Sequence, residues 1–260
     1  MKQTLFLLAL AVALITAGCG NSDDNGGPAT TELTLLATGT YGDDPLVMFE
    51  RTYNYEDGMQ LQMQLLQTYL SDIALVYEED GTEKEELLTN IALVSFADVY
   101  TDADATAGVE VVKMEVPVRN YTGLKIGLGV SPELNATIPP DYDLTHPLSQ
   151  NYWEDASSYI FFKIEGNADL DADGEFQEKL TYHIGGNNNY SSVQFTGAID
   201  LEKGTPQTLA LNFDLQEILI RQQDGAFWDF REAQFAHSTT SPAAVFMAEN
   251  IPAAVSLETR

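Results

Sequence analysis

The sequence has 260 residues, 12 Lys and Arg against 40 Asp and Glu, a formal net charge of −28 at pH 7 and one cysteine. This negative field repels phosphate backbones, which excludes nucleic acid as a partner, and it disfavours binding to anionic lipid through a basic patch. One cysteine cannot form an internal disulfide or a thiolate metal site. A hydrophobic fraction of 44% supplies enough apolar residues for a core and excludes a disordered chain.

The first nineteen residues have the pattern of a secretion signal. Lys2 precedes an apolar run over residues 5–15, which is too short to span a bilayer stably, and the segment ends in Ala17-Gly18-Cys19. The alternative reading is a transmembrane anchor. The segment resembles a bacterial lipoprotein signal, which implies that residues 1–18 are removed and that Cys19 is lipidated. We therefore expect a lipid-anchored protein of the outer membrane, at the periplasmic face or the cell surface.

A polar segment follows Cys19. Residues 20–28 contain no large apolar side chain, so we expect a flexible tether over residues 19–32 and a single domain over residues 33–260. Asp23 and Asp24 resemble the acidic export tag of Bacteroidetes-type surface lipoproteins.

The rest of the chain has the alternation of β-strands. Residues 59–65 alternate apolar and polar side chains without a break, and residues 125–130 repeat that period with glycine at the polar positions. Further strands are predicted at 47–55, 69–77, 91–96, 109–118, 159–165, 179–184, 193–199 and 208–215. About ten strands separated by turn residues predict a single antiparallel β-sandwich. Pro242 after Ser241 predicts a short helix over residues 241–250.

The sequence contains no recognisable catalytic motif. A nucleophile motif of the GxSxG type and a glycine-rich phosphate loop are both absent from the sequence. Two carboxylates are enough for a glycosidase, but 40 acidic residues make such a pair uninformative. We therefore expect a binding protein and no enzyme.

An acidic motif lies at residues 169–175. Asp169, Asp171 and Asp173, followed by Gly174 and Glu175, match the start of a DxDxDG calcium loop. Leu180 stands where an EF-hand has its bidentate glutamate, and the flanking segments are predicted strands. The motif is therefore either a calcium-binding loop between strands or a bare acidic hairpin, and in both cases its role is structural.

Three histidines, His146, His183 and His237, are the remaining metal-ligand candidates. Strand alternation places His183 on the face opposite Tyr182 and Ile184, where an imidazole either binds a metal or is simply solvated. Neutral imidazoles without an available thiolate suit copper or zinc.

Several blocks resemble a known family. Residues 146–166 (HPLSQNYWEDASSYIFFKIEG) resemble the central motif of the MbnP-like copper-binding proteins, named after a methanobactin-associated periplasmic protein. Residues 182–185 (YHIG), 66–75 (LQTYLSDIAL), 126–130 (IGLGV) and 237–251 resemble four further blocks of that family, in family order. Asn151 and Asp155 stand where the family pattern has a methionine and a second tryptophan.

The resemblance implies an all-β lipoprotein that binds copper and serves copper acquisition or handling. It implies a copper site formed by His146, His183 and His237 near Trp153. In the family, a tryptophan can be oxidised to kynurenine by a dihaem MauG-like enzyme, and Trp153 takes that position here. It also implies that this enzyme and an outer-membrane transporter are partners. For Trp153, the alternative is a lid packed on Tyr159 or Phe161.

The sequence is also compatible with two other functions. One is a surface module that binds glycan or protein through exposed aromatics such as Tyr41, Tyr53 and Tyr190. The other is a structural lipoprotein stabilised by calcium at residues 169–175. Trp228 is expected in the core.

Overall fold

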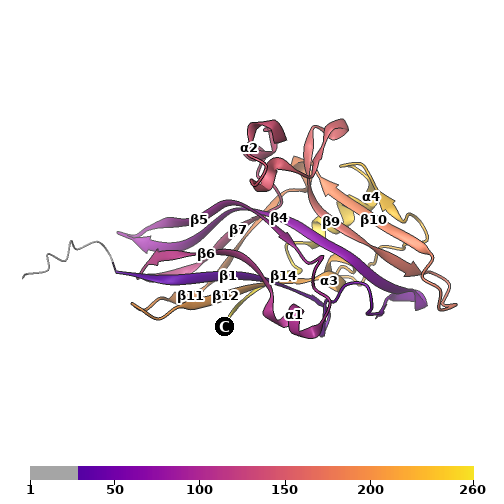
Figure 1. The fold of residues 1–260 in the computed structure, drawn as a ribbon, viewed down its shortest axis with the longest axis horizontal. Helices are drawn as coiled ribbons and strands as arrows, with labels where there is room; N and C mark the ends of the chain where they lie inside the picture. Colours follow the sequence, from indigo (N-terminus) through magenta and orange to yellow (C-terminus); the bar gives the residue numbers. More distant parts are fainter. Residues whose placement is uncertain (1–28) are drawn as a thin grey trace, which may run out of the picture.

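The computed structural model describes residues 29–260 as two β-sheets packed face to face, with a few short helices (Figure 1). The predicted signal peptide, Cys19 and the greater part of the predicted tether lie outside the described residues. The first sheet contains β1 (Thr30–Tyr41), β2 (Asp44–Pro45), β6 (Val109–Pro117), β12 (Gln207–Asp214) and β14 (Val255–Thr259). Strand β1 begins three residues inside the segment predicted as tether. No helix of residues 29–260 is both long and apolar enough to cross a membrane.

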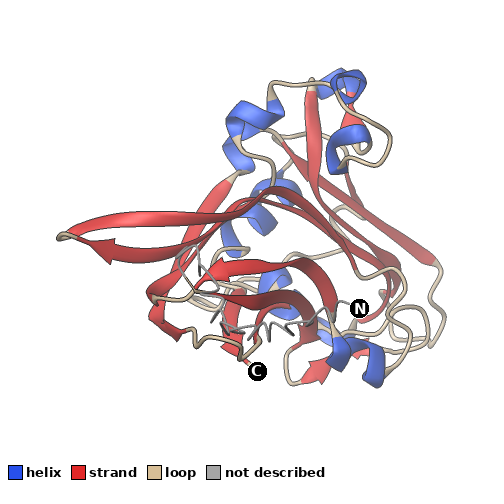
Figure 2. Ribbon diagram, turned by 60° about the vertical axis from the view of Figure 1, so that its left-hand side comes forward, coloured by secondary structure: helices blue, strands red, loops and turns tan. Residues whose placement is uncertain are grey.

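The second sheet has nine strands. They are β3 (Tyr53–Asn54), β4 (Gln60–Glu79), β5 (Thr82–Ser95), β7 (Asn120–Leu128), β8 (Tyr152–Trp153), β9 (Ser158–Asp169), β10 (Glu178–Gly185), β11 (Ser191–Asp200) and β13 (Phe235–Ala236). Their order is β11-β7-β4-β9-β10-β13, with β3 and β5 also on β4 and β8 on β9. The long hairpin of β4 and β5 projects from the body of the molecule (Figure 2).

The helices are short and lie at the ends of strands. They are α1 (Asp102–Ala107), α2 (Pro132–Asn135), α3 (Leu215–Leu219) and α4 (Pro242–Asn250). Five single 3₁₀ turns complete the set: η1 (Glu56–Gly58), η2 (Pro139–Asp141), η3 (Pro147–Ser149), η4 (Glu154–Ala156) and η5 (Asn187–Asn189). The predicted C-terminal helix is confirmed, because Ser241 caps α4 by accepting the N–H of Ala244 at 3.2 Å.

The predicted all-β sandwich is confirmed, but its strands are not all antiparallel. Strands β1 and β12 pair in parallel over eight residue pairs, and β10 and β13 pair in parallel over two. Alternation of side chains specifies which face of a strand is buried, and this is the same for both strand directions. The direction of pairing therefore depends on chain topology, which the local pattern does not contain.

Three predicted strands differ in detail. Residues 59–65 and 69–77 form one 20-residue strand, β4, which pairs with β9 in its first half and with β7 in its second. Asp72, with φ of 49°, lies within the register shift between Ser71 and Ala74 of the β4–β7 pairing. Of the strand predicted over residues 47–55, only β3 exists, because Phe49 takes the left-handed conformation (φ 70°) and interrupts the extended chain.

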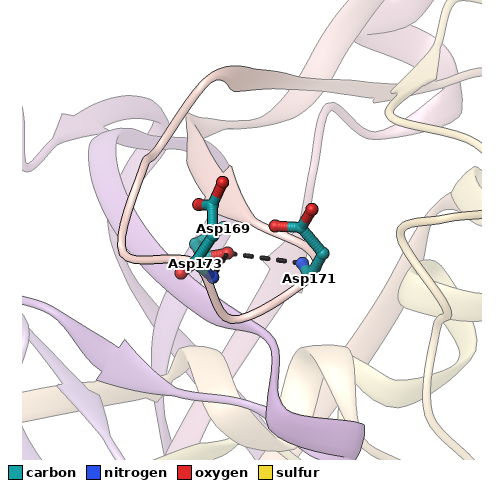
Figure 3. A group of neighbouring side chains, drawn as sticks. All are labelled: Asp169, Asp171 and Asp173. Atoms are coloured by element: carbon teal, nitrogen blue, oxygen red, sulfur yellow. Dashed lines mark hydrogen bonds between the residues drawn. The ribbon is translucent and has the colours of Figure 1, made fainter.

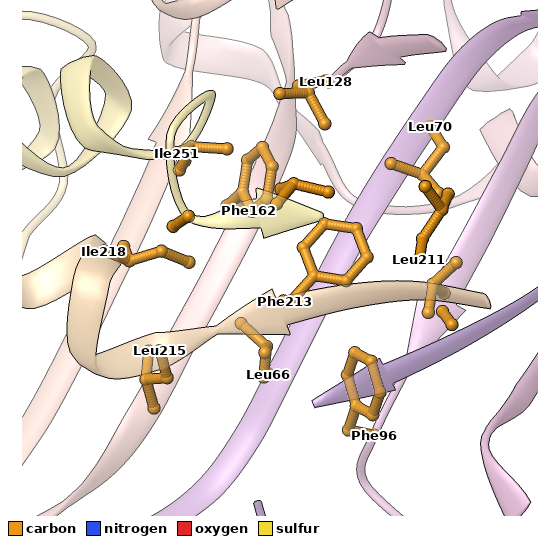
Figure 4. Packing of buried hydrophobic residues seen from close by; sticks show 14 of the residues in the cluster. Leu66, Leu70, Phe96, Leu128, Phe162, Leu211, Phe213, Leu215, Ile218 and Ile251 are labelled. Carbon is orange, nitrogen blue, oxygen red and sulfur yellow. The ribbon is translucent and has the colours of Figure 1, made fainter. Parts of the chain in front are cut away.

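The core lies between the sheets and is closed by α3 and the end of α4 (Figure 4). Phe213 of β12 packs edge-on against Phe96, with 6.3 Å between ring centroids, and both side chains are fully buried. Leu66 of β4 and Phe162 of β9 belong to the same cluster from the second sheet. Burial of this apolar surface is the main source of stability for the sandwich.

The opposite face of β9 and β10 is polar and only partly covered. On β9, Phe162 and Ile164 point into the core, so Lys163 and Glu165 point away from it. Residue His183 of β10 pairs directly with Lys163 and therefore shares this outer face. We call the group of Lys163, Glu165, His183 and His237 the histidine face.

Candidate functional site

Two of the three histidines meet on the histidine face. His183 lies between the buried residues Tyr182 and Ile184 of β10, and 21% of its side chain is exposed. Strand β13 pairs in parallel with β10 through Tyr182 and Ala236, so the next residue, His237, lies beside His183. The two rings have 5.0 Å between centroids and an angle of 30° between their planes. Residues 54 positions apart in the chain thus form one imidazole pair.

A carboxylate contacts this pair. Oε1 of Glu165 lies 2.9 Å from Nε2 of His183, across the β9–β10 ladder. Lys163, two residues earlier on the same face, donates from Nζ to Oδ1 of Asn151 at 2.6 Å. Asn151 also donates to Oε1 of Gln67 at 2.8 Å, so the side chain of Asn151 connects β4 with β9.

Burial lowers the pKa of two members of the histidine face, His183 and Lys163. Desolvation lowers the pKa of His183, the hydrogen bond and charge of Glu165 act in the opposite direction, and His237 and Lys163 lower it further. The pKa of Lys163 is also lowered by burial, against the attraction of Glu165. His183 is consequently neutral at pH 7, and a neutral imidazole has the free lone pair that a metal ligand requires.

The geometry of the pair suits a single metal ion. Metal–imidazole bonds are about 2.0 Å long, so two nitrogens on one ion are separated by up to about 4 Å. The centroids of the two rings are 5.0 Å apart, which is close to this separation. The available donors are imidazole nitrogens with one carboxylate beside them, a combination that suits copper or zinc better than a hard cation.

His146 does not share this site. Its ring stacks on Tyr142 with 4.1 Å between centroids, and its Nδ1 accepts the N–H of Leu148 at 3.1 Å, which caps η3. Within residues 29–260, the only group of three or more His, Cys, Asp or Glu whose ligand atoms lie within 4.8 Å of one another is an aspartate cluster. The expected convergence of three histidines is therefore wrong for this structure.

Trp153 also lies apart from the pair. It pairs with Ser158 at the start of β9, whereas His183 pairs with Lys163, five residues further along. At about 3.3 Å per residue, those two points on β9 are about 16 Å apart. The rings that pack on Tyr159 are those of Tyr152 and Tyr69, with 5.1 and 6.2 Å between centroids.

The predicted acidic motif forms the loop between β9 and β10. The carboxylates of Asp169, Asp171 and Asp173 converge within 4.8 Å (Figure 3), whereas Glu175 is not part of the group. Asp169 is buried and accepts three backbone N–H groups of its own loop, including that of Gly174 at 2.8 Å.

These N–H groups decide the protonation of Asp169. Burial pushes its pKa upward, but the backbone hydrogen bonds outweigh this and leave the pKa lowered. The contribution of Asp169 to stability is therefore complete above the ordinary aspartate pKa, and it is lost as pH falls through the lowered value. At neutral pH Asp169 is therefore ionised. Leu180, in place of the EF-hand glutamate, is buried in the core.

Of the three aromatic residues named for ligand binding, two are buried and Tyr190 is partly exposed. Tyr41 and Tyr53 are buried with 4.7 Å between their rings, and Tyr190 is packed against the core. The interpretation as a glycan- or protein-binding module therefore keeps only Tyr190 of the three aromatics named for it. Trp228, expected in the core, lies at its edge and donates from Nε1 to the carbonyl of Ala233 at 3.2 Å.

Lys163 and Glu165 are the members of the site for which the sequence predicted no role. Both stand in the alternating stretch of β9, so their position on the outer face was readable from the pattern. Their neighbours on β10 and β13 were not readable, because the alternation does not specify which strands pair.

These features define a class of protein. It is an all-β sandwich with a pair of histidines on one sheet face and a carboxylate hydrogen-bonded to one of the two rings. Residues 30–240 match the MbnP family model, which covers most of the chain, so the protein belongs to the MbnP family. The fold is similar to the solved structure of MbnP from Methylosinus trichosporium, with a TM-score of 0.52, 15% sequence identity and coverage of 88% of this chain and 99% of that chain. No curated protein matches the sequence significantly.

Proposed function

We propose that this protein binds one copper(I) ion between His183 and His237, outside the cytoplasm, and acts in copper acquisition or handling rather than as an enzyme. The observation that carries the proposal is the imidazole pair, with 5.0 Å between ring centroids and Glu165 hydrogen-bonded to one ring. Few neutral nitrogen donors favour a soft monovalent ion over hard divalent ions. Membership of the MbnP family agrees with this assignment.

A competition titration tests the proposal. Bicinchoninate forms a coloured complex with Cu(I), and the protein should withdraw one equivalent of copper from it under anaerobic, reducing conditions. Metal analysis of protein purified from its native envelope should find copper at the same stoichiometry. Failure to withdraw copper, together with copper-free native protein, would reject the copper function.

The proposal includes a lipid anchor at Cys19 in the outer membrane and an outer-membrane transporter as partner. The signal-like residues 1–18 support the anchor. Fatty-acid labelling in the host should mark the wild-type protein and not Cys19→Ser.

Trp153 has no ligand role in this proposal. Oxidation of Trp153 by a dihaem partner is a separate question, answered by a mass gain of about 4 Da in the peptide that contains it.

A calcium ion at the loop of Asp169, Asp171 and Asp173 is a second proposal, favoured by the convergence of the three carboxylates. Calcium at 100 times its Kd stabilises a protein by about 2.7 kcal/mol. For a domain of this size, that corresponds to a rise in Tm of about 5–10 °C.

Differential scanning calorimetry with Ca²⁺ and with EDTA measures this rise. Asp171→Asn should abolish it, because the variant removes one of the three converging carboxylates. Asp80→Asn is the matched control, since Asp80 lies at the exposed tip of the β4–β5 hairpin, and this variant should keep the full shift. A Tm that ignores Ca²⁺ in the wild type would show that the loop is an acidic hairpin closed by Asp169 alone.

A further inference from the structure

We propose that Glu165 is the positioning residue of the metal site: it holds His183 in the tautomer that carries its proton on Nε2, and thereby presents Nδ1 to the metal. The inference rests on the proposed copper function, since it assigns the ligand atom of that site. The observation that supports it is the contact between Oε1 of Glu165 and Nε2 of His183, which are 2.9 Å apart.

The tautomer follows from what a carboxylate can do. An ionised carboxylate only accepts hydrogen bonds, so the proton in this contact belongs to Nε2 of His183. A neutral imidazole carries one N–H, and its second nitrogen has the free lone pair. With Nε2 engaged by Glu165, Nδ1 is the nitrogen that can bind a metal.

Glu165 is held at this place by the backbone rather than by other side chains. It pairs with Thr181 of β10 and with Leu65 of β4, next to a register shift between Met63 and Leu65. Gly166 follows it, and a Cβ there would lie 2.5 Å from the carbonyl oxygen of Gln62, so the two strands approach closely at this point. Within residues 29–260, the carboxylate of Glu165 hydrogen-bonds to His183 and to no other side chain.

The carboxylate does more than orient the ring. A negative partner on the second nitrogen of a metal-bound histidine increases the basicity of the ligating nitrogen, and removal of such partners weakens metal binding by about 10–100-fold. We expect Glu165→Ala to lower Cu(I) affinity within that range. Glu165→Gln keeps an acceptor oxygen and loses the charge, so its affinity should lie between those of Glu165→Ala and the wild type.

Two measurements on the full-length protein test the inference. Long-range ¹H–¹⁵N correlation spectra of the metal-free protein report the tautomer of His183 directly. We expect the Nε2–H form in the wild type. In Glu165→Ala, His183 should lose its preference for this form. Bicinchoninate competition reads the Cu(I) affinity of each variant. Glu178→Ala is the matched control, because it removes the same charge from β10, five residues from His183, and should leave both readouts unchanged.

The outcomes separate the two proposals. If the wild type binds copper, and either His183 carries its proton on Nδ1 or both Glu165 variants keep the wild-type affinity, the positioning role is wrong and the copper function stands. If the wild type binds no copper, the proposed function fails and the positioning role fails with it. Thermal melts of the variants show whether each one is folded, and Glu165→Gln keeps the test valid if Glu165→Ala does not fold.

Discussion

His183→Ala and His237→Ala should each lower the affinity for Cu(I) by at least about 100-fold. Loss of an outer hydrogen-bond partner already costs about 10–100-fold, and loss of one of two nitrogen ligands costs more. Both side chains are partly exposed on the histidine face, so their truncation removes no buried core group and both variants should fold. Bicinchoninate competition gives the affinities, and circular dichroism confirms the fold.

His146→Ala is the matched control for this experiment. Nδ1 of His146 already accepts the N–H of Leu148, and its ring stacks on Tyr142, so the proposed site does not use it. Its Cu(I) affinity should equal that of the wild type within a factor of about two. A loss of affinity in His146→Ala equal to that in His183→Ala would mean that the copper site includes the turn at η3, which contradicts the two-histidine site.

Phe213→Ala should reduce the free energy of unfolding by about 3–5 kcal/mol, the usual range for phenylalanine truncation in a packed core. Phe213 is fully buried between the sheets and contacts Phe96, so truncation of its side chain leaves a cavity beside Phe96. Urea denaturation should show a lower midpoint with an unchanged m-value.

Phe235→Ala makes the same chemical change on β13, where 62% of the residue is exposed. It should change the free energy of unfolding by less than about 0.5 kcal/mol, as surface substitutions usually do. Equal losses in the two variants would show that the space between the sheets is not the stabilising core.

Local pattern was sufficient for the parts of the fold that depend on one strand at a time. The outward direction of His183 on β10 and the helix capped by Ser241 follow from residues close together in the chain. The acidic loop at residues 169–175 was also placed correctly between two strands, because its turn residues and flanking alternation are adjacent.

The features that depend on neighbouring strands were not predictable from one sequence. His237 meets His183 only because β13 returns 54 residues later to pair in parallel with β10. The separation of Trp153 from His183 depends equally on register along β9. The family resemblance predicted that the three histidines and Trp153 belong to one site. The strand pairing instead separates Trp153 from His183 and brings Glu165 into contact with His183.

Diffraction from crystals of the Cu(I)-loaded protein, recorded on both sides of the copper absorption edge, locates the bound copper ion. We expect one anomalous peak between the rings of His183 and His237, about 2 Å from Nδ1 of His183. A single peak at His146 or at the aspartate loop, or no peak on the chain, would show that His183 and His237 do not form the copper site.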